Sequence, residues 1–178
     1  MKLIVVRHGQ TAWNAARLLQ GATDIPLNET GLQQARETAA LLHDIHVDRI
    51  FLSPLARAAE TGRIIAEGRN VPVTTDDRLR ERGYGEFEGK LKDKDAYARL
   101  WAYTKNYTFE SAENVRACFA RIYTFLDEIR TLYPDETVLI ATHAGVAKVV
   151  RCYSLGMMSD AELADYVPQN AAPQIYDL

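Results

Sequence analysis

The sequence has little cysteine, no long apolar run and no excess of positive charge. Its two cysteines, Cys118 and Cys152, lack the spacing of a metal-binding motif or a disulfide framework. No apolar stretch approaches the roughly 18 residues that a membrane-spanning helix needs. A net charge of -3 is not the strong basic excess typical of nucleic-acid-binding proteins. We therefore expect no metal, no disulfide, and neither a membrane nor a nucleic acid as partner.

Length and composition are those of an ordinary globular domain. The chain has 178 residues, 47% hydrophobic and 25% charged, which argues against disorder and predicts a single domain over residues 1–178. The N-terminal apolar run is too short, and too soon followed by Arg7, to be a signal peptide. This favours a cytoplasmic location. The sequence carries no signal for the oligomeric state.

Apolar stretches of strand length alternate with helical patterns along the chain. The alternation predicts an α/β fold, a three-layer sandwich whose mostly parallel central sheet is flanked by helices. Pro72 lacks an N–H to donate to a neighbouring strand, so we expect the strand that contains it to lie at a sheet edge. We predict strands at 3–6, 47–52, 71–75, 138–141 and 175–176, a long loop at 10–27, and helices at 28–44, 53–68, 111–133, 146–155 and from 159.

Residue types that cap helices mark several of the predicted starts. Asn28, Ser53 and Ser111 are each expected at an N-cap, with Pro54 at a first helical position.

Residues 90–108 mix lysines with tyrosines and a tryptophan. We predict a helical flap there, either a solvated helix packed on the body or a lid that faces a substrate.

Three strand-to-helix turns carry cations and imidazoles. Arg7 and His8 end the first strand, Arg57 follows the second, and His143 follows the fourth. Ligands of open α/β sheets bind beyond the carboxyl ends of the strands, so we expect these side chains to converge. Two arginines and two histidines in one crevice need an anion to offset their charge. A phosphoryl group fits best, because arginine binds its oxygens through paired donors.

An ordered set of motifs covers nearly the whole chain and resembles the histidine phosphatase superfamily, the phosphoglycerate-mutase-like group. The motifs are Arg7-His8-Gly9-Gln10-Thr11 with Trp13-Asn14, Gln20-Gly21, Leu27-Asn28-Glu29-Thr30-Gly31, Ser53-Pro54-Leu55-Ala56-Arg57, Leu79-Arg80-Glu81, Gly85-Glu86-Phe87-Glu88-Gly89, Glu110-Ser111 and Thr142-His143-Ala144-Gly145. The sequence departs from the family pattern at Ala144, where a second glycine is usual, and at Lys90. Relatives also usually add another strand beyond the position of Leu178.

The resemblance implies a role for each residue of the candidate site. His8 is the expected nucleophile, which becomes phosphohistidine, and Glu81 is the proton donor to the leaving oxygen and then the base for water. The expected clamp on the phosphoryl oxygens is Arg7, Arg57 and His143. The expected substrate-binding residues are Asn14, Gln20, Gly21 and Ala144.

Chemistry supports these roles without the family. An attacking imidazole must be neutral, and neighbouring arginines lower its pKa. The leaving alkoxide needs a general acid. Composition leaves Glu86 and Glu88 as rivals of Glu81 for this role. No metal or other cofactor is expected, because the arginines supply the positive charge that a magnesium ion would otherwise bring.

The leading functional hypothesis is a metal-independent phosphomonoesterase acting on a small phosphorylated substrate. A cofactor-dependent mutase is the alternative within the family, but it needs a closed lid to exclude water, and the interval between Glu81 and Ser111 is short for one. A non-catalytic protein that binds phosphorylated ligands is the alternative from another class. The flap could suit a sugar phosphate, a nucleotide or an intermediate such as ribazole phosphate, and the sequence does not choose among them.

Overall fold

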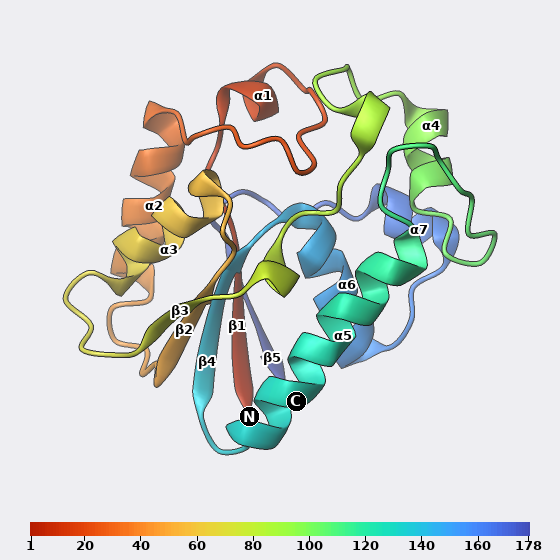
Figure 1. Ribbon diagram of the computed structural model, residues 1–178. Coiled ribbons are helices and arrows are strands. Elements are labelled where there is room, and N and C mark those ends of the chain that lie inside the picture. Colours follow the sequence, from red (N-terminus) through yellow and green to blue (C-terminus); the bar gives the residue numbers. More distant parts are fainter.

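The computed structural model describes residues 1–178 and is built around one five-stranded sheet (Figure 1). The strand order is β3-β2-β4-β1-β5. Four strands run parallel and β5 runs antiparallel to β1, as the mostly parallel prediction requires. The strands are β1 (Lys2–Arg7), β2 (Arg49–Leu52), β3 (Val73–Thr75), β4 (Thr137–Thr142) and β5 (Pro173–Asp177).

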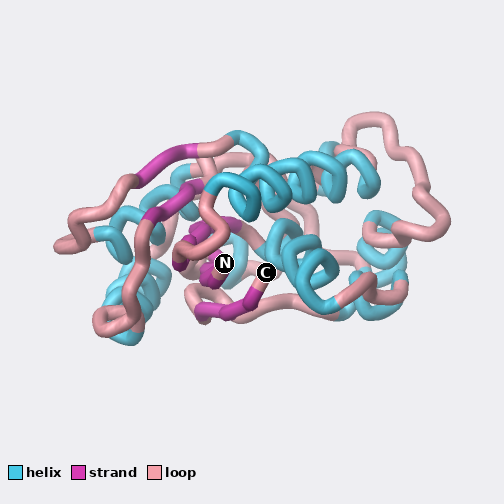
Figure 2. The backbone as a smooth tube through the Cα atoms, turned by 90° about the horizontal axis from the view of Figure 1, so that it is seen from below, coloured by secondary structure: helices cyan, strands magenta, loops and turns pink.

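Helices cover both faces of the sheet, and the predicted three-layer sandwich is confirmed (Figures 1 and 2). Successive strand residues point to opposite faces. In β1, Ile4 and Val6 pack in a core with Leu42 and Ile65 on one side. Leu3 and Val5 belong to a larger core on the other side, with α5 and α6. The apolar run of β1 is therefore buried on both faces, as in other parallel sheets.

The helices broadly follow the predicted ranges, with one short addition. A single turn lies inside the stretch predicted as a loop, where Thr11 and Asn14 form a capping box. The helices are α1 (Ala12–Ala15), α2 (Glu29–Leu41), α3 (Ala56–Ala66), α4 (Lys94–Leu100), α5 (Val115–Leu132), α6 (Ala144–Leu155) and α7 (Asp160–Asp165), with 3-10 turns η1 (Asp77–Leu79) and η2 (Gly85–Phe87).

Two predicted helix caps are wrong and one is confirmed. Asn28 caps α2, where its side chain accepts from the Gly31 N–H at 2.8 Å. Asn114, not Ser111, caps α5, and the Ser111 hydroxyl instead contacts Glu86. Ser53 does not cap α3, which begins at Ala56. Serine is a residue type that caps helices well, but both hydroxyls here bind residues distant in the sequence, Ser53 to His143 and Ser111 to Glu86.

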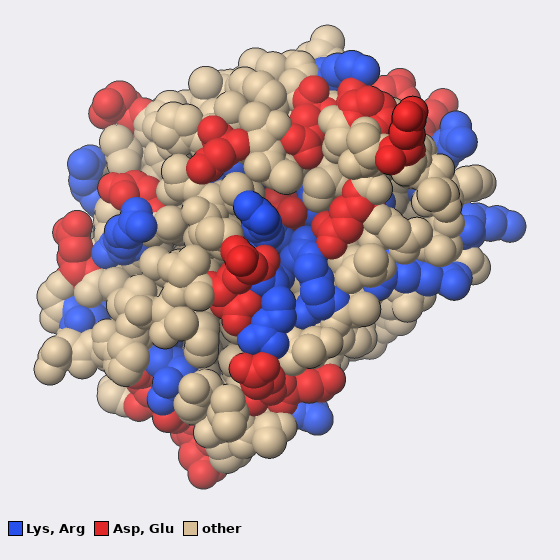
Figure 3. All heavy atoms as spheres, in the orientation of Figure 1, with Lys and Arg blue, Asp and Glu red and all other residues tan.

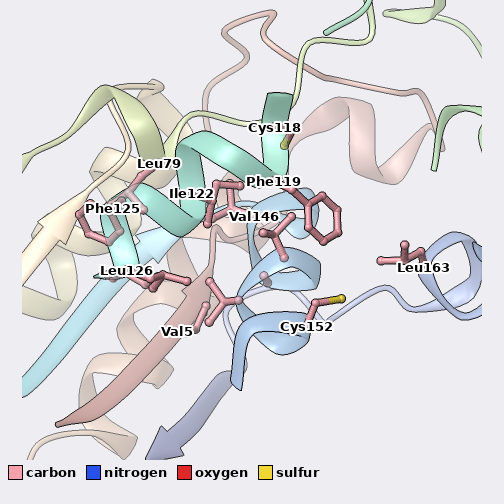
Figure 4. Close-up of a cluster of buried hydrophobic side chains, with 14 of the residues drawn as sticks. Val5, Leu79, Cys118, Phe119, Ile122, Phe125, Leu126, Val146, Cys152 and Leu163 are labelled. Carbon is pink, nitrogen blue, oxygen red and sulfur yellow. The ribbon is translucent and has the colours of Figure 1, made fainter. Parts of the chain in front are cut away.

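Helix α5 supplies much of the larger core (Figure 4). Its residues Cys118, Ile122, Phe125 and Leu126 are fully buried, at the spacings of three and four that form one helix face. The Phe125 ring meets Phe51 of β2 edge-on, at 5.3 Å between centroids. These contacts anchor α5 against the sheet.

Ion pairs tie the outer face of α5 to the segment that leads into the site. Arg78 of η1 pairs with Asp76 at 2.7 Å and with Glu128 at 2.8 Å. Arg121 pairs with Glu113 at 2.7 Å and donates to the Arg78 carbonyl at 2.6 Å. Figure 3 shows basic and acidic side chains side by side across the middle of this face. The pairs fix the start of the segment that carries Glu81.

The edge strand predicted from Pro72 is confirmed, and β5 forms the other edge of the sheet. β3, which follows Pro72, pairs only with β2, and β5 pairs only with β1. The two ends of the chain meet beside this second edge, where the Leu178 N–H donates to the Met1 carbonyl at 2.9 Å. No helix has both the length and the apolar character needed to cross a membrane.

Candidate active site

The three strand-to-helix turns meet at the carboxyl ends of β1, β2 and β4. β1 and β4 are neighbours in register, and the His8 N–H donates to the Thr142 carbonyl at 2.8 Å. The rings of His8 and His143 have centroids 5.3 Å apart. Arg7, His8 and Arg57 line one cavity. We call Arg7, His8, Arg57 and His143 the strand-end cluster, and the sequence predicted that its members meet.

His8 is buried and held in one orientation. Its Nδ1 lies 2.7 Å from the Gly9 carbonyl oxygen. A carbonyl only accepts, so Nδ1 carries the proton and Nε2 keeps its lone pair in the neutral ring. Burial, followed by the charges of Arg7 and Arg57, holds the pKa of His8 well below its usual value. The arginine effect was predicted, and desolvation is the larger cause.

His143 is fully buried and is held by Ser53. The Ser53 hydroxyl lies 2.7 Å from His143 Nε2, so the serine expected to cap α3 orients an imidazole instead. Nδ1 of His143 is buried and has no hydrogen-bond partner within the protein. Burial, then Arg57, His8 and Arg7, holds the pKa of His143 well below its usual value. The ring is therefore neutral at pH 7.

Backbone carbonyls hold the outer nitrogens of both arginines. Arg57 donates through its two Nη atoms to the carbonyls of Thr23 and Gly21, each at 2.8 Å. Arg7 donates through Nη1 to the Pro168 carbonyl at 2.7 Å. The Nε atoms of both arginines are buried without a partner in the protein. Burial lowers the pKa of each guanidinium, but arginine remains charged at neutral pH.

Glu81 is held at the N-terminus of α6. Its carboxylate accepts from the Gly145 N–H at 3.1 Å and from the Arg82 N–H at 2.9 Å. A Cβ at position 145 would lie 2.3 Å from Glu81 Oε1 and 3.1 Å from the Trp101 ring. Glycine is therefore required here for the carboxylate to approach the helix. Ala144, at the departure from the family pattern, lines the cavity.

The cavity has a volume of about 520 Å³. The predicted substrate-binding residues Asn14, Gln20, Gly21 and Ala144 all line it. The flap segment contributes Leu91, Lys92 and Tyr97 to the lining, and the lid function of this segment stays a prediction. Sequence reasoning missed Arg17, Leu18, Leu19, Tyr84 and Val167, which also line it.

The two rival carboxylates lie apart from the cavity lining. Glu86 is exposed and contacts Ser111. Glu88 binds the loop that follows Gly21, and the Ala22 N–H donates to it at 2.9 Å. Of the three candidates only Glu81 lines the cavity with His8. No group of three or more His, Cys, Asp or Glu side chains is arranged to hold a metal ion.

The neutral imidazoles make folding sensitive to acid. Their pKa values are lowered in the folded state, so the unfolded chain binds more protons as the pH falls through about 6.5, and stability decreases. At pH 5.5 each ring costs up to about 1.4 kcal/mol of unfolding free energy. We predict that His143→Gln loses less stability than wild type between pH 7.5 and 5.5 in urea denaturation. Exposed His43 is the control, and H43Q should follow wild type; H143Q following wild type would contradict the prediction.

The chain is similar in sequence to known phosphatases and phosphoglycerate mutases. The uncharacterized phosphatase PhoE of Bacillus subtilis is 39% identical over 139 residues, 78% of this chain and 69% of that protein. Phosphoserine phosphatase 1 of Hydrogenobacter thermophilus is 31% identical over 163 residues, 88% of this chain and 77% of that protein. Proteins named phosphoglycerate mutases also match.

The fold is shared with solved structures of the same kind. YhfR of Bacillus stearothermophilus superposes with a TM-score of 0.86 at 31% identity, covering 98% of this chain and 89% of that one. The family model described as histidine phosphatase superfamily (branch 1) matches residues 3–176. The motifs predicted this membership, and the chain belongs to the histidine phosphatase superfamily.

Proposed function

We propose that the protein is a metal-independent phosphomonoesterase that hydrolyses a small phosphorylated metabolite through a phosphohistidine on His8. One observation carries the proposal. Arg7 Nε, Arg57 Nε and His143 Nδ1 are buried polar atoms without a partner in the protein, and their residues surround a neutral imidazole. Buried donors are costly when unpaired, and phosphoryl oxygens would satisfy all three.

In the first step, Nε2 of His8 attacks phosphorus and the ester P–O bond breaks. The hydrogen bond from Nδ1 to the Gly9 carbonyl supports this, because it leaves the lone pair on Nε2. The arginines stabilise charge on the equatorial oxygens, as such groups do in phosphoryl transfer generally. The leaving alkoxide takes its proton from Glu81, which lines the same cavity.

In the second step, water attacks phosphohistidine and the N–P bond breaks. Glu81 takes the water proton, which restores the acid for the next cycle, and inorganic phosphate leaves. The positive charge in this scheme comes from arginine, so no step calls for a metal. Asn14, Gln20, Gly21 and Ala144 would hold the substrate at the cavity wall.

The mutase alternative is tested by its cofactor. A mutase needs a bisphosphorylated intermediate and must shield it from water, whereas Leu91 and Lys92 of the flap line the cavity and are exposed. We predict that purified protein hydrolyses p-nitrophenyl phosphate without bisphosphoglycerate and in the presence of a chelator. Phosphate release is measured colorimetrically. Activity that appears only with the bisphosphate would favour the mutase.

The nucleophile is tested by substitution and by labelling. We predict that His8→Ala lowers kcat by at least about a thousandfold, because no other buried imidazole offers a free Nε2. Wild type given labelled substrate and quenched should retain a phosphoryl group that is acid-labile and alkali-stable. His46→Ala, at an exposed histidine, is the control and should keep both properties. Wild type that retains no label would support the non-catalytic alternative.

The general acid is tested by comparing leaving groups. We predict that Glu81→Gln lowers kcat/KM for an alkyl phosphate about a hundred- to ten-thousandfold. The loss for p-nitrophenyl phosphate should be much smaller, because that phenolate leaves without a proton. Equal losses on the two esters would mean that Glu81 acts in some other way. E86Q, at the exposed rival, should leave both rates near wild type.

A further inference from the structure

The Glu88 carboxylate binds two loops that are far apart in the sequence. Oε1 accepts from the N–H groups of Ala22 at 2.9 Å and of Tyr84 at 2.8 Å. Oε2 accepts from the Thr23 N–H at 2.9 Å and from the Thr23 hydroxyl. Four donors on one carboxylate fill its accepting sites. All hydrogen-bond-accepting sites of the Glu88 carboxylate are thus occupied by groups of the protein, although Glu88 does not line the cavity.

The loop that Glu88 holds is the one that binds Arg57. The carbonyls of Gly21 and Thr23 accept the two Nη donors of Arg57, each at 2.8 Å. One residue on, Asp24 accepts from the Ala56 N–H at 2.8 Å, so the loop is also fixed to the start of α3. With both Nη atoms engaged, the buried Nε is the nitrogen that has no partner.

We propose that Glu88 is a positioning residue for Arg57. It orders residues 21–23 so that their carbonyls accept from both Nη atoms of Arg57, and thereby fixes the orientation in which the guanidinium meets the cavity. The inference rests on the proposed function, since it assigns Glu88 to the same reaction. Without the carboxylate, the N–H groups of Ala22 and Thr23 would lose the acceptor that ties this loop to residue 88, and the positions of the Gly21 and Thr23 carbonyls would be less well fixed.

Glycine at position 21 is consistent with this arrangement. Gly21 has a φ of 57°, which favours glycine. A Cβ there would lie 2.0 Å from Glu88 Oε1. The backbone at Gly21 therefore lies so close to the Glu88 carboxylate that a side chain at this position would collide with it. The nearby Glu86 does not contact this loop, and its exposed carboxylate accepts from the Ser111 hydroxyl.

The first experiment compares Glu88→Gln with Glu86→Gln. Glutamine keeps the shape of Glu88 but replaces one of its two accepting oxygens with an NH₂ group, which faces N–H donors and cannot accept from them. E88Q should lower kcat/KM for p-nitrophenyl phosphate about ten- to a hundredfold and weaken calorimetric binding of inorganic phosphate similarly. E86Q should match wild type in both. A thermal melting curve of each variant, recorded at the pH of the assay, shows whether the variant is folded at the assay temperature.

The second experiment is a double-mutant cycle with Arg57→Ala, which separates positioning from general damage. If Glu88 acts through Arg57, E88Q should change phosphate affinity and kcat/KM less than about twofold in the R57A background. A purely structural loss would be the same in both backgrounds. An E88Q that is folded and indistinguishable from E86Q, or full additivity with R57A, would overturn the inference.

The phosphate measurement distinguishes this inference from the proposed function. Wild type that binds phosphate but hydrolyses no ester would contradict the proposed function, and weaker phosphate binding by E88Q would still support the role of Glu88. Wild type that hydrolyses esters, with E88Q equal to wild type, would overturn the role of Glu88 and leave the function standing. Wild type that does neither would overturn both.

Discussion

Burial of two guanidinium groups beside two imidazoles is the constraint on which the rest of the site depends. Arg57 is wholly buried, and Arg7 is half-buried, with its Nε atom shielded from solvent. Such charges are stable inside a protein only when polar groups replace the lost water. Backbone carbonyls of Gly21, Thr23 and Pro168 do so here. The loop after α1 and the C-terminal tail must therefore close over the strand ends.

The same constraint fixes the state of the imidazoles. Next to buried cations, protonation of His8 or His143 is doubly unfavourable, by desolvation and by repulsion. Each ring then needs one acceptor or donor to set its orientation, which Gly9 and Ser53 provide. The arginines thus do more than attract an anion. Together with burial, which is the larger cause, they lower the pKa of His8 and so favour the unprotonated imidazole.

Local sequence was sufficient to predict the strands and the residues at their ends. It was insufficient to predict hydrogen bonds between residues that are far apart in the chain. The apolar runs of β1 and β4 predicted the sheet, and the residues that follow them predicted the strand-end cluster. Ser53 is a good cap by type, yet its hydroxyl binds His143, 90 residues away. Nothing near Pro168 indicates that its carbonyl holds Arg7. Backbone acceptors carry no residue signature, so sequence cannot reveal them.

In the proposed reaction, different parts of the cavity would bind the phosphoryl group and the alcohol. The strand-end cluster sits on strand ends and helix starts, which are the rigid parts of the fold. The outer cavity wall is formed by two irregular segments joined at a Leu18–Leu91 bridge, and loops of this kind accept changes in length and side chain readily. Changes in Leu91 or Lys92 would reshape the rim without touching the carbonyls that hold the arginines. Under the proposed function, one phosphoryl site would serve different alcohols, and the rim formed by these two segments would select among them.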